Sequence, residues 1–132
     1  VASMHTTSNS AQYWHIKTNI AYNHNVMFIA RVHGYIYGNS GHILDVSRSG
    51  YAYSGSASSV ISSQTVNNGS YGYSFDTYYA ASGANLCFRV SYIGSYYARM
   101  AFDIKMQSPT GYNHDFAVIE HAANSVSGNH YT

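Results

Sequence analysis

The sequence predicts an all-β protein, an antiparallel β-sandwich of jelly-roll-like type with seven or eight strands. Three observations support this fold class. Hydrophobic and polar residues alternate at a period of two, turn residues separate the alternating stretches, and no stretch has a helical period. The chain also contains a single proline in 132 residues, and proline is the residue that disrupts strand pairing most strongly. An incompletely closed barrel is the other arrangement that such strands allow.

The clearest strand begins at Val26 and runs for about ten residues. Side chains of a strand point alternately to its two faces, so we expect one face to be buried and the other to face outward. The two sets are Val26, Phe28, Ala30 and Val32, and Met27, Ile29, Arg31 and His33. Further strands are predicted at 14–18, 43–53, 60–66, 71–79, 86–92, 98–106 and 116–120.

Two short turns are predicted between these strands. Gly94 and Ser95 separate two alternating stretches, 86–92 and 98–106, which predicts a hairpin. Asn68-Gly69 favours a type I′ hairpin turn between Val66 and Tyr71, although Asn68-Gly69-Ser70 also matches the acceptor pattern for N-glycosylation. The turn is the preferred interpretation unless the protein is secreted through a eukaryotic pathway.

Composition suggests three segments. Residues 1–12 are small and polar without a period, which predicts a flexible N-terminal arm or linker. Residues 13–123 are predicted to form the sandwich, and residues 124–132 a C-terminal tail. The only cysteine, Cys87, excludes an internal disulfide and a cysteine-based zinc site, and we expect it to be buried within a strand.

The charge pattern argues against several partners. Charged residues make up 8% of the chain, compared with about 25% in typical soluble domains. The formal net charge is +1 and the basic residues are scattered singly, so we expect no nucleic-acid partner. No apolar run approaches the roughly 18 residues of a transmembrane span, so no membrane insertion is expected. The basic residues are Lys17, Arg31, Arg48, Arg89, Arg99 and Lys105.

Fifteen tyrosines are the most unusual feature of the sequence. A tyrosine has a flat apolar ring and a hydroxyl at its tip, which suits contacts with sugars and with protein surfaces. High strand propensity is the alternative explanation for their number. A domain of this size cannot bury all fifteen, so we predict a tyrosine-rich ligand-binding surface. Its candidate residues are Tyr35, Tyr37, Tyr51, Tyr53, Tyr96 and Tyr97.

Signals for catalysis are weak, so we predict a protein that is not an enzyme and has no cofactor. No Gly-x-Ser-x-Gly elbow occurs, and the five acidic residues include no close pair in sequence. Asp103 lies between Arg99 and Lys105 on one strand face, which indicates a surface ion pair. The eight histidines include no His-x-His pair, so no metal site is predicted, and His114 with Asp115 is the best available candidate.

Three segments resemble a known class of domains: YWHIKTNI at 13–20, NVMFIARVHGYIYG at 25–38 and PTGYNHDFAVIE at 109–120. They are similar to the distal Tyr- and Gly-rich β-domains of bacteriophage tail-fibre and related virion proteins, particularly of marine and cyanobacterial phages. The resemblance runs from about residue 13 to 123. It implies a homotrimer or another symmetric oligomer, exposed on the virion surface or otherwise extracellular, that contacts a glycan or protein of the host surface. It carries over no individual binding residue.

The sequence thus favours a host-attachment domain that binds a glycan through tyrosines, with no covalent chemistry. Several identical weak sites on one oligomer would raise the effective affinity. A structural subunit, such as a capsid-decoration or filament protein, is the second hypothesis, because its tyrosines would then pack against copies of itself. A secreted lectin-like module of non-viral origin is the third.

Overall fold

The part of the chain that the structure describes folds into ten strands that form two layers. The computed structural model describes residues 2–6, 12–36, 42–53, 61–68, 73–79, 85–92, 97–107, 116–121 and 130–131. The strands are β1 (Ala2–His5), β2 (Gln12–Ala21), β3 (Val26–Ile36), β4 (His42–Ala52), β5 (Ile61–Asn68), β6 (Tyr73–Tyr79), β7 (Asn85–Tyr92), β8 (Ala98–Gln107), β9 (Phe116–His121) and β10 (His130–Tyr131). A 3-10 turn, η1 (Tyr22–His24), follows β2. Asn25 ends this turn in the left-handed conformation with φ of 56°.

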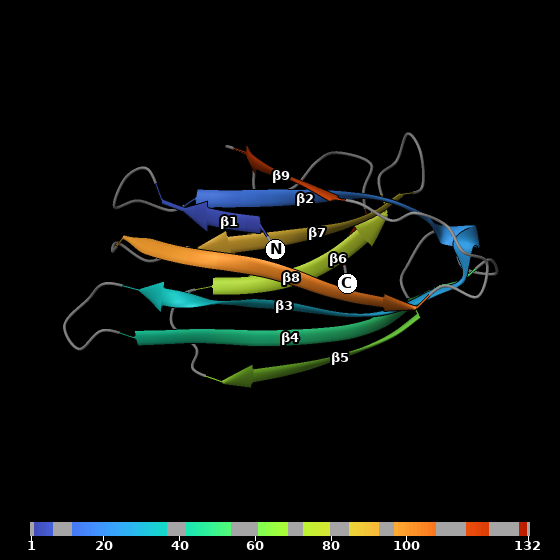
Figure 1. The fold of residues 1–132 in the computed structure, drawn as a ribbon, viewed down its shortest axis with the longest axis horizontal. Coiled ribbons are helices and arrows are strands. Elements are labelled where there is room, and N and C mark those ends of the chain that lie inside the picture. The colour runs from blue at the N-terminus through green and yellow to red at the C-terminus, as the bar shows by residue number, and fades with distance from the viewer. Residues whose placement is uncertain are drawn as a thin grey trace.

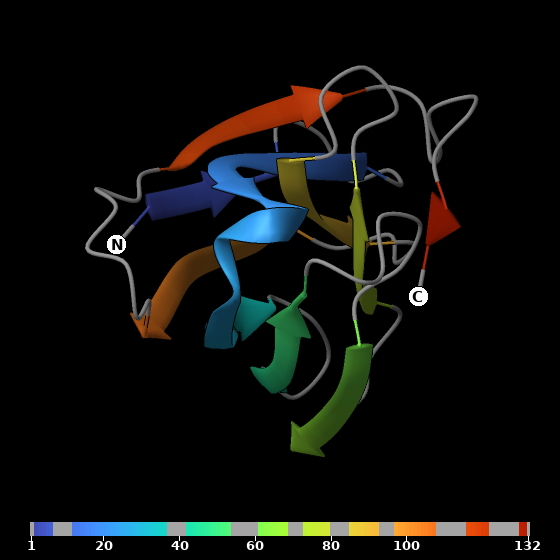
Figure 2. The same cartoon turned by 90° about the vertical axis from the view of Figure 1, so that its right-hand side faces the viewer.

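The strands pair into two antiparallel five-stranded sheets that face each other (Figure 1). Sheet A has the order β1-β8-β3-β4-β5, and sheet B has the order β10-β6-β7-β2-β9. Figure 2 is a view along the long axis of the fold, and it shows the two layers of strands one above the other. The predicted all-β sandwich is therefore confirmed. The eight strands expected from the alternating pattern correspond to β2 through β9.

The two additional strands correct the predicted arm and tail. Strand β1 pairs with β8 from Ala2↔Phe102 to His5↔Arg99, and Met4 is only 3% exposed. Strand β10 pairs with β6 at His130↔Tyr79. The predicted flexible arm is thus wrong for residues 2–6, and the predicted tail is wrong for residues 130–131. Both strands are too short to show a period, and edge strands are held through their backbones.

The predicted hairpin between 86–92 and 98–106 is wrong. Strand β7 lies in sheet B and pairs with β2 and β6, whereas β8 lies in sheet A and pairs with β1 and β3. The connection therefore crosses from one sheet to the other. Two strands of a hairpin each turn every second residue toward the core, and so do two strands that face each other across the core. The alternation therefore cannot distinguish these two arrangements.

The Asn68-Gly69 hairpin is also wrong, because β5 and β6 belong to different sheets. Residues 69–72 lie outside the described part of the chain. Hairpin pairing of consecutive strands instead joins β3 to β4, β4 to β5 and β6 to β7. Local turn chemistry is compatible with a tight reversal, but which sheet the next strand joins depends on contacts far away in the sequence.

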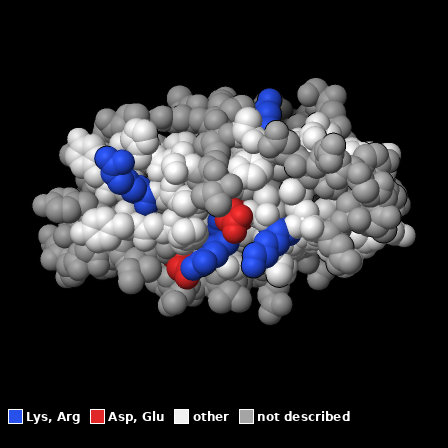
Figure 3. Space-filling view, viewed as in Figure 1, with Lys and Arg blue, Asp and Glu red and all other residues white. Residues whose placement is uncertain are grey.

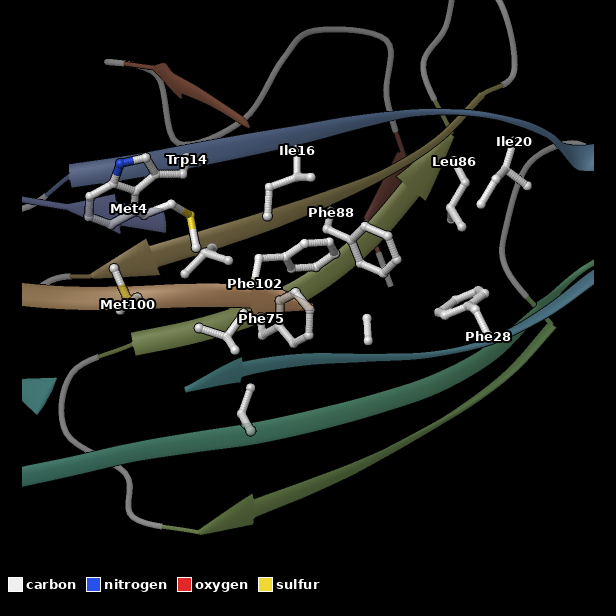
Figure 4. Packing of buried hydrophobic residues seen from close by; sticks show 14 of the residues in the cluster. Met4, Trp14, Ile16, Ile20, Phe28, Phe75, Leu86, Phe88, Met100 and Phe102 are labelled. Atoms are coloured by element: carbon white, nitrogen blue, oxygen red, sulfur yellow. The ribbon is translucent and has the colours of Figure 1, made fainter. Parts of the chain in front are cut away.

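The core lies between the two sheets and is organised around phenylalanine. Phe88 on β7 contacts Phe102 on β8 and Phe28 on β3, with ring centroids 5.2 and 5.4 Å apart. Phe75 stacks on Phe88 at 5.7 Å, and Phe116 meets Phe102 edge-on at 5.1 Å. All five phenylalanines of the chain thus form one connected cluster. Figure 4 shows Phe75, Phe88 and Phe102 between the sheets, with Met4, Trp14 and Met100 toward one end.

One arginine is buried inside this core. Arg48 lies on the inner face of β4, is 7% exposed, and donates from Nη1 to the carbonyl oxygen of Phe75 at 3.1 Å. The hydrogen bond joins sheet A to sheet B. Burial lowers the pKa of Arg48, and the nearby Asp76 carboxylate acts in the opposite direction. A buried cation requires such compensating groups, and this hydrogen bond is one contact that ties β4 to β6 across the core.

Replacing Phe102 tests the phenylalanine cluster. Phe102 is 0% exposed and contacts three other phenylalanine rings. We expect Phe102→Ala to lower the free energy of unfolding by about 3–5 kcal/mol, because it leaves a cavity between the sheets. The measurement is denaturant unfolding followed by circular dichroism. Met27→Ala is the control, since Met27 is 51% exposed and its loss should change stability by no more than about 0.5 kcal/mol. Equal losses in both variants would contradict the assigned core.

Candidate functional site

The outer face of sheet A carries the exposed aromatic and charged residues that sequence patterning singled out. On β3, Met27, Ile29 and Tyr35 are 51%, 54% and 51% exposed, while Val26 and Val32 on the opposite face are 0% exposed. The predicted division of this strand into an inner and an outer face is therefore confirmed. Because adjacent strands are in register, each outward residue of β3 lies beside outward residues of β4 and β8.

The four predicted tyrosines that the structure describes do not lie on one continuous surface. Tyr35 and Tyr97 lie at the end of sheet A where β3 finishes and β8 begins. Tyr51 and Tyr53 lie at the opposite end, where their rings are 5.4 Å apart. Tyr51 is opposite Met27 in the register of β3 and β4. Met27 precedes Tyr35 by eight residues on β3, so these two positions are about 27 Å apart along the extended strand. Tyr37 and Tyr96 lie outside the described residues.

We define the Tyr35–Tyr97 patch as His5, Tyr35, Tyr97 and Arg99. Tyr35 and Tyr97 are 51% and 54% exposed, and His5 and Arg99 are also exposed. The four residues line a hollow of about 230 Å³ together with Thr6 and Ala98. A second hollow of about 320 Å³ shares His5 and Arg99 with it and continues toward Ser3 and His33. The patch is therefore an open groove with aromatic walls and polar donors.

Strand β1 supplies one side of the patch and is fixed there by hydrogen bonds of Thr6, the residue that follows it. The Thr6 amide donates to the Ala98 carbonyl oxygen at 3.0 Å, and the Ala98 amide donates to Thr6 Oγ1 at 2.9 Å. These bonds set His5 beside Arg99, its partner in register. Because residues 1–12 were predicted to be a flexible arm, His5 was not predicted as a site residue. Only long-range pairing places it there, so no local signal could have found it.

Gly34 keeps the other side of the patch closely packed. A Cβ atom at this position would collide with the carbonyl oxygen of Arg99 and lie 2.8 Å from the Cα of Met100. Both obstacles are backbone atoms of β8, which cannot move aside as a flexible side chain would. Glycine therefore allows β3 and β8 to approach each other at the point where they present Tyr35 and Arg99.

A second feature of the same face is an apolar groove at its other end. We define the Met27–Tyr51 groove as the hollow of about 510 Å³ lined by Met27, Phe28, Ile29, Ser49, Gly50, Tyr51, Lys105 and Met106. Met27 and Ile29 are more than half exposed there. Exposed apolar side chains that cluster on one surface are typical of contacts with a partner.

Between these two features, acidic and basic side chains balance one another. Arg31 donates from Nε to Asp45 at 2.9 Å and from Nη2 to the second oxygen of the same carboxylate at 3.0 Å. This hydrogen-bonded pairing lowers the pKa of Asp45, so the group remains a carboxylate and is unsuited to act as a general acid. Figure 3 shows acidic and basic side chains in contact in the middle of this face, with other basic side chains standing apart from them.

The expected surface ion pair of Asp103 with Arg99 or Lys105 is absent among the described residues. Asp103 is instead opposite Arg31 in the register of β3 and β8. The pKa of Arg31 is raised mainly by the hydrogen bond to Asp45 and by the charge of Asp45, and the Asp103 carboxylate makes a smaller contribution in the same direction. Positions on the same strand face two or four residues apart are farther apart than positions on adjacent strands, so the cross-strand partner has the advantage.

The outer face of sheet B contains a polar cluster that the sequence pattern did not reveal. His15 Nδ1 and the Tyr78 hydroxyl are 2.7 Å apart, and both residues are 2% exposed. Next to them, Arg89 donates to Asp76 from Nε at 3.1 Å and from Nη2 at 2.6 Å. Cys87 is buried within β7, as predicted. His15 bonds to Tyr78, and Arg89 bonds to Asp76, so the cluster is consistent with a structural role.

Two further features of the described residues concern metal binding and membrane crossing. Within the described ranges, no three histidine, cysteine, aspartate or glutamate side chains lie close enough together to hold a metal ion. His114 and Asp115, the best pair in the sequence, lie outside these ranges. Among the same residues, no helix is long and apolar enough to cross a membrane.

Comparison of the chain with models of protein families, with curated proteins and with solved structures found no match.

Proposed function

We propose that this protein is a non-enzymatic attachment domain of a phage virion that binds a glycan of the host surface through the Tyr35–Tyr97 patch. The observation that carries this proposal is the pair of tyrosines, each about half exposed, that line one hollow with His5 and Arg99. Tyrosine rings at rigid strand ends offer apolar surface for the face of a sugar, and the neighbouring donors bond to its oxygens. The assignment to a virion rests on the sequence resemblance to tail-fibre domains.

The size and shape of the patch favour a chain end or a short stretch of glycan. The hollow of about 230 Å³ is smaller than the roughly 300–1,000 Å³ of pockets that enclose a drug-sized ligand. A shallow site of this kind binds weakly by itself. A homotrimer or another symmetric oligomer would compensate, because several copies bound to one surface raise the effective concentration of each site. Such an oligomer, displayed outside the cell on the virion surface, is part of the proposal.

The test compares two tyrosine variants on an array of host-surface glycans. We expect Tyr35→Ala to weaken binding at least tenfold and to leave the melting temperature unchanged, because the ring is exposed and contributes little to folding. Tyr53→Ala is the matched control: Tyr53 is 41% exposed but lies at the other end of the sheet, so its loss should leave binding intact. Equal losses in both variants, or no glycan binding by the unaltered protein, would refute the proposed site.

A structural, self-assembling subunit is the second candidate function, favoured by the Met27–Tyr51 groove. Its apolar surface adjoins a region where Arg31, Lys105, Asp45 and Asp103 carry balanced charges, so a second copy could present acids to bases and bases to acids. If this face drives open-ended assembly, light scattering will show large particles that Ile29→Lys converts to small ones. A discrete oligomer that is unaffected by Ile29→Lys would exclude this role for the groove.

A further inference from the structure

Arg99 differs from the other three arginines of the chain. Arg31 bonds to Asp45, Arg89 bonds to Asp76, and Arg48 bonds to the carbonyl oxygen of Phe75. Arg99 is exposed and makes no hydrogen bond or ion pair with any residue that the structure describes. Its five N–H donors are therefore directed to solvent or to a ligand.

The surroundings of Arg99 contain donors and rings but no described acid. Its partners in the register of the neighbouring strands are His5 on β1 and Tyr35 on β3. The described residues that line the two hollows of the patch include no aspartate or glutamate. The nearest acid on its own strand face, Asp103, is four residues away and faces Arg31. The patch thus has a local positive charge in a chain whose formal net charge is only +1.

We propose that the Tyr35–Tyr97 patch selects acidic glycans, with Arg99 pairing the carboxylate or sulfate group of a sugar. A guanidinium binds such an anion through two parallel hydrogen bonds, and this geometry also fixes the orientation of the ligand. The adjacent Tyr35 and Tyr97 rings then receive the faces of the sugar that carries the anion or of its neighbour. This inference depends on the proposed glycan-binding function and adds the chemical class of the ligand.

The position of Arg99 also explains why its charge should affect affinity. Arg99 lies between Tyr35 on β3 and His5 on β1 in the register of sheet A, and all three residues line the same hollow. A ligand that fills this hollow would therefore displace water from around the guanidinium. An ion pair that is partly shielded from solvent is stronger than one in open water, because water screens it less. Lys105 has the same charge on the same face of β8 but lies at the Met27–Tyr51 groove, away from the patch.

The experiment uses an array in which each acidic glycan is printed beside its neutral counterpart, uronic acids beside their methyl esters and sulfated sugars beside desulfated ones. The unaltered protein should bind the acidic members better than the neutral ones. Arg99→Gln should reduce binding to the acidic members by about tenfold to a hundredfold, the loss expected for one hydrogen-bonded charge pair, and reduce binding to the neutral members far less. Arg99→Lys should retain part of the preference, because a lysine keeps the charge but lacks the paired donors.

Lys105→Gln is the matched control, since it removes one positive charge from the same strand face, and it should keep the preference for acidic glycans. Equal binding to acidic and neutral members that still requires Tyr35 would overturn this inference and leave the proposed glycan-binding function standing. A preference that survives Arg99→Gln, or that falls equally in Lys105→Gln, would also overturn it. No binding to any glycan would refute both proposals.

Discussion

The contact between Phe88 and Phe102 across the sandwich determines which residues the outer surface can present. The two rings come from different sheets, and their centroids are 5.2 Å apart. Phe102 points inward on β8, so Arg99, three residues earlier, points outward because side chains of a strand alternate. The same rule applied to Phe28, which also contacts Phe88, turns Tyr35 outward on β3. The candidate site is thus a consequence of how the core is packed.

The chain uses its two main aromatic residue types differently. All five phenylalanines join the core cluster, whereas Tyr35, Tyr53 and Tyr97 are the most exposed of the described tyrosines. A buried hydroxyl needs a hydrogen-bond partner, so phenylalanine is the better core residue and tyrosine the better surface residue. Burial raises the pKa of Tyr79 to about 12, because it disfavours the charged phenolate. The neutral Tyr79 hydroxyl also shows the penalty, since it is buried with no hydrogen-bond partner among the described residues. Tyr78 avoids it by bonding to His15.

Periodicity predicted the parts of the fold that depend on a single strand. It located β2 through β9 and the two faces of β3, because burial of one face imposes a period of two on any strand. It could not predict how the strands connect, since β7 and β8 have the same inward pattern in a hairpin as they do on opposite sheets. The short edge strand β1 was missed because its four residues are too few to show a period, although Met4 is buried.

The candidate site was predictable to a similar extent. Tyrosine content indicated a contact surface, and Tyr35 and Tyr97 do share one hollow. The sequence could not separate them from Tyr51 and Tyr53, because the distance between the two groups depends on the register of β3 with β4 and β8. His5 and Arg99 were not recognised as neighbours for the same reason: they are paired only by β1 and β8.

The central claim is that the Tyr35–Tyr97 end of sheet A is the surface that meets the glycan. Titration of the labelled protein with an acidic oligosaccharide, followed through backbone amide signals by NMR, tests this claim most directly. The account predicts that signals of His5, Tyr35, Tyr97 and Arg99 shift together with one saturation curve, while those of Met27 and Tyr51 remain in place. Shifts confined to Met27 and Tyr51, or to the outer face of sheet B, would contradict it.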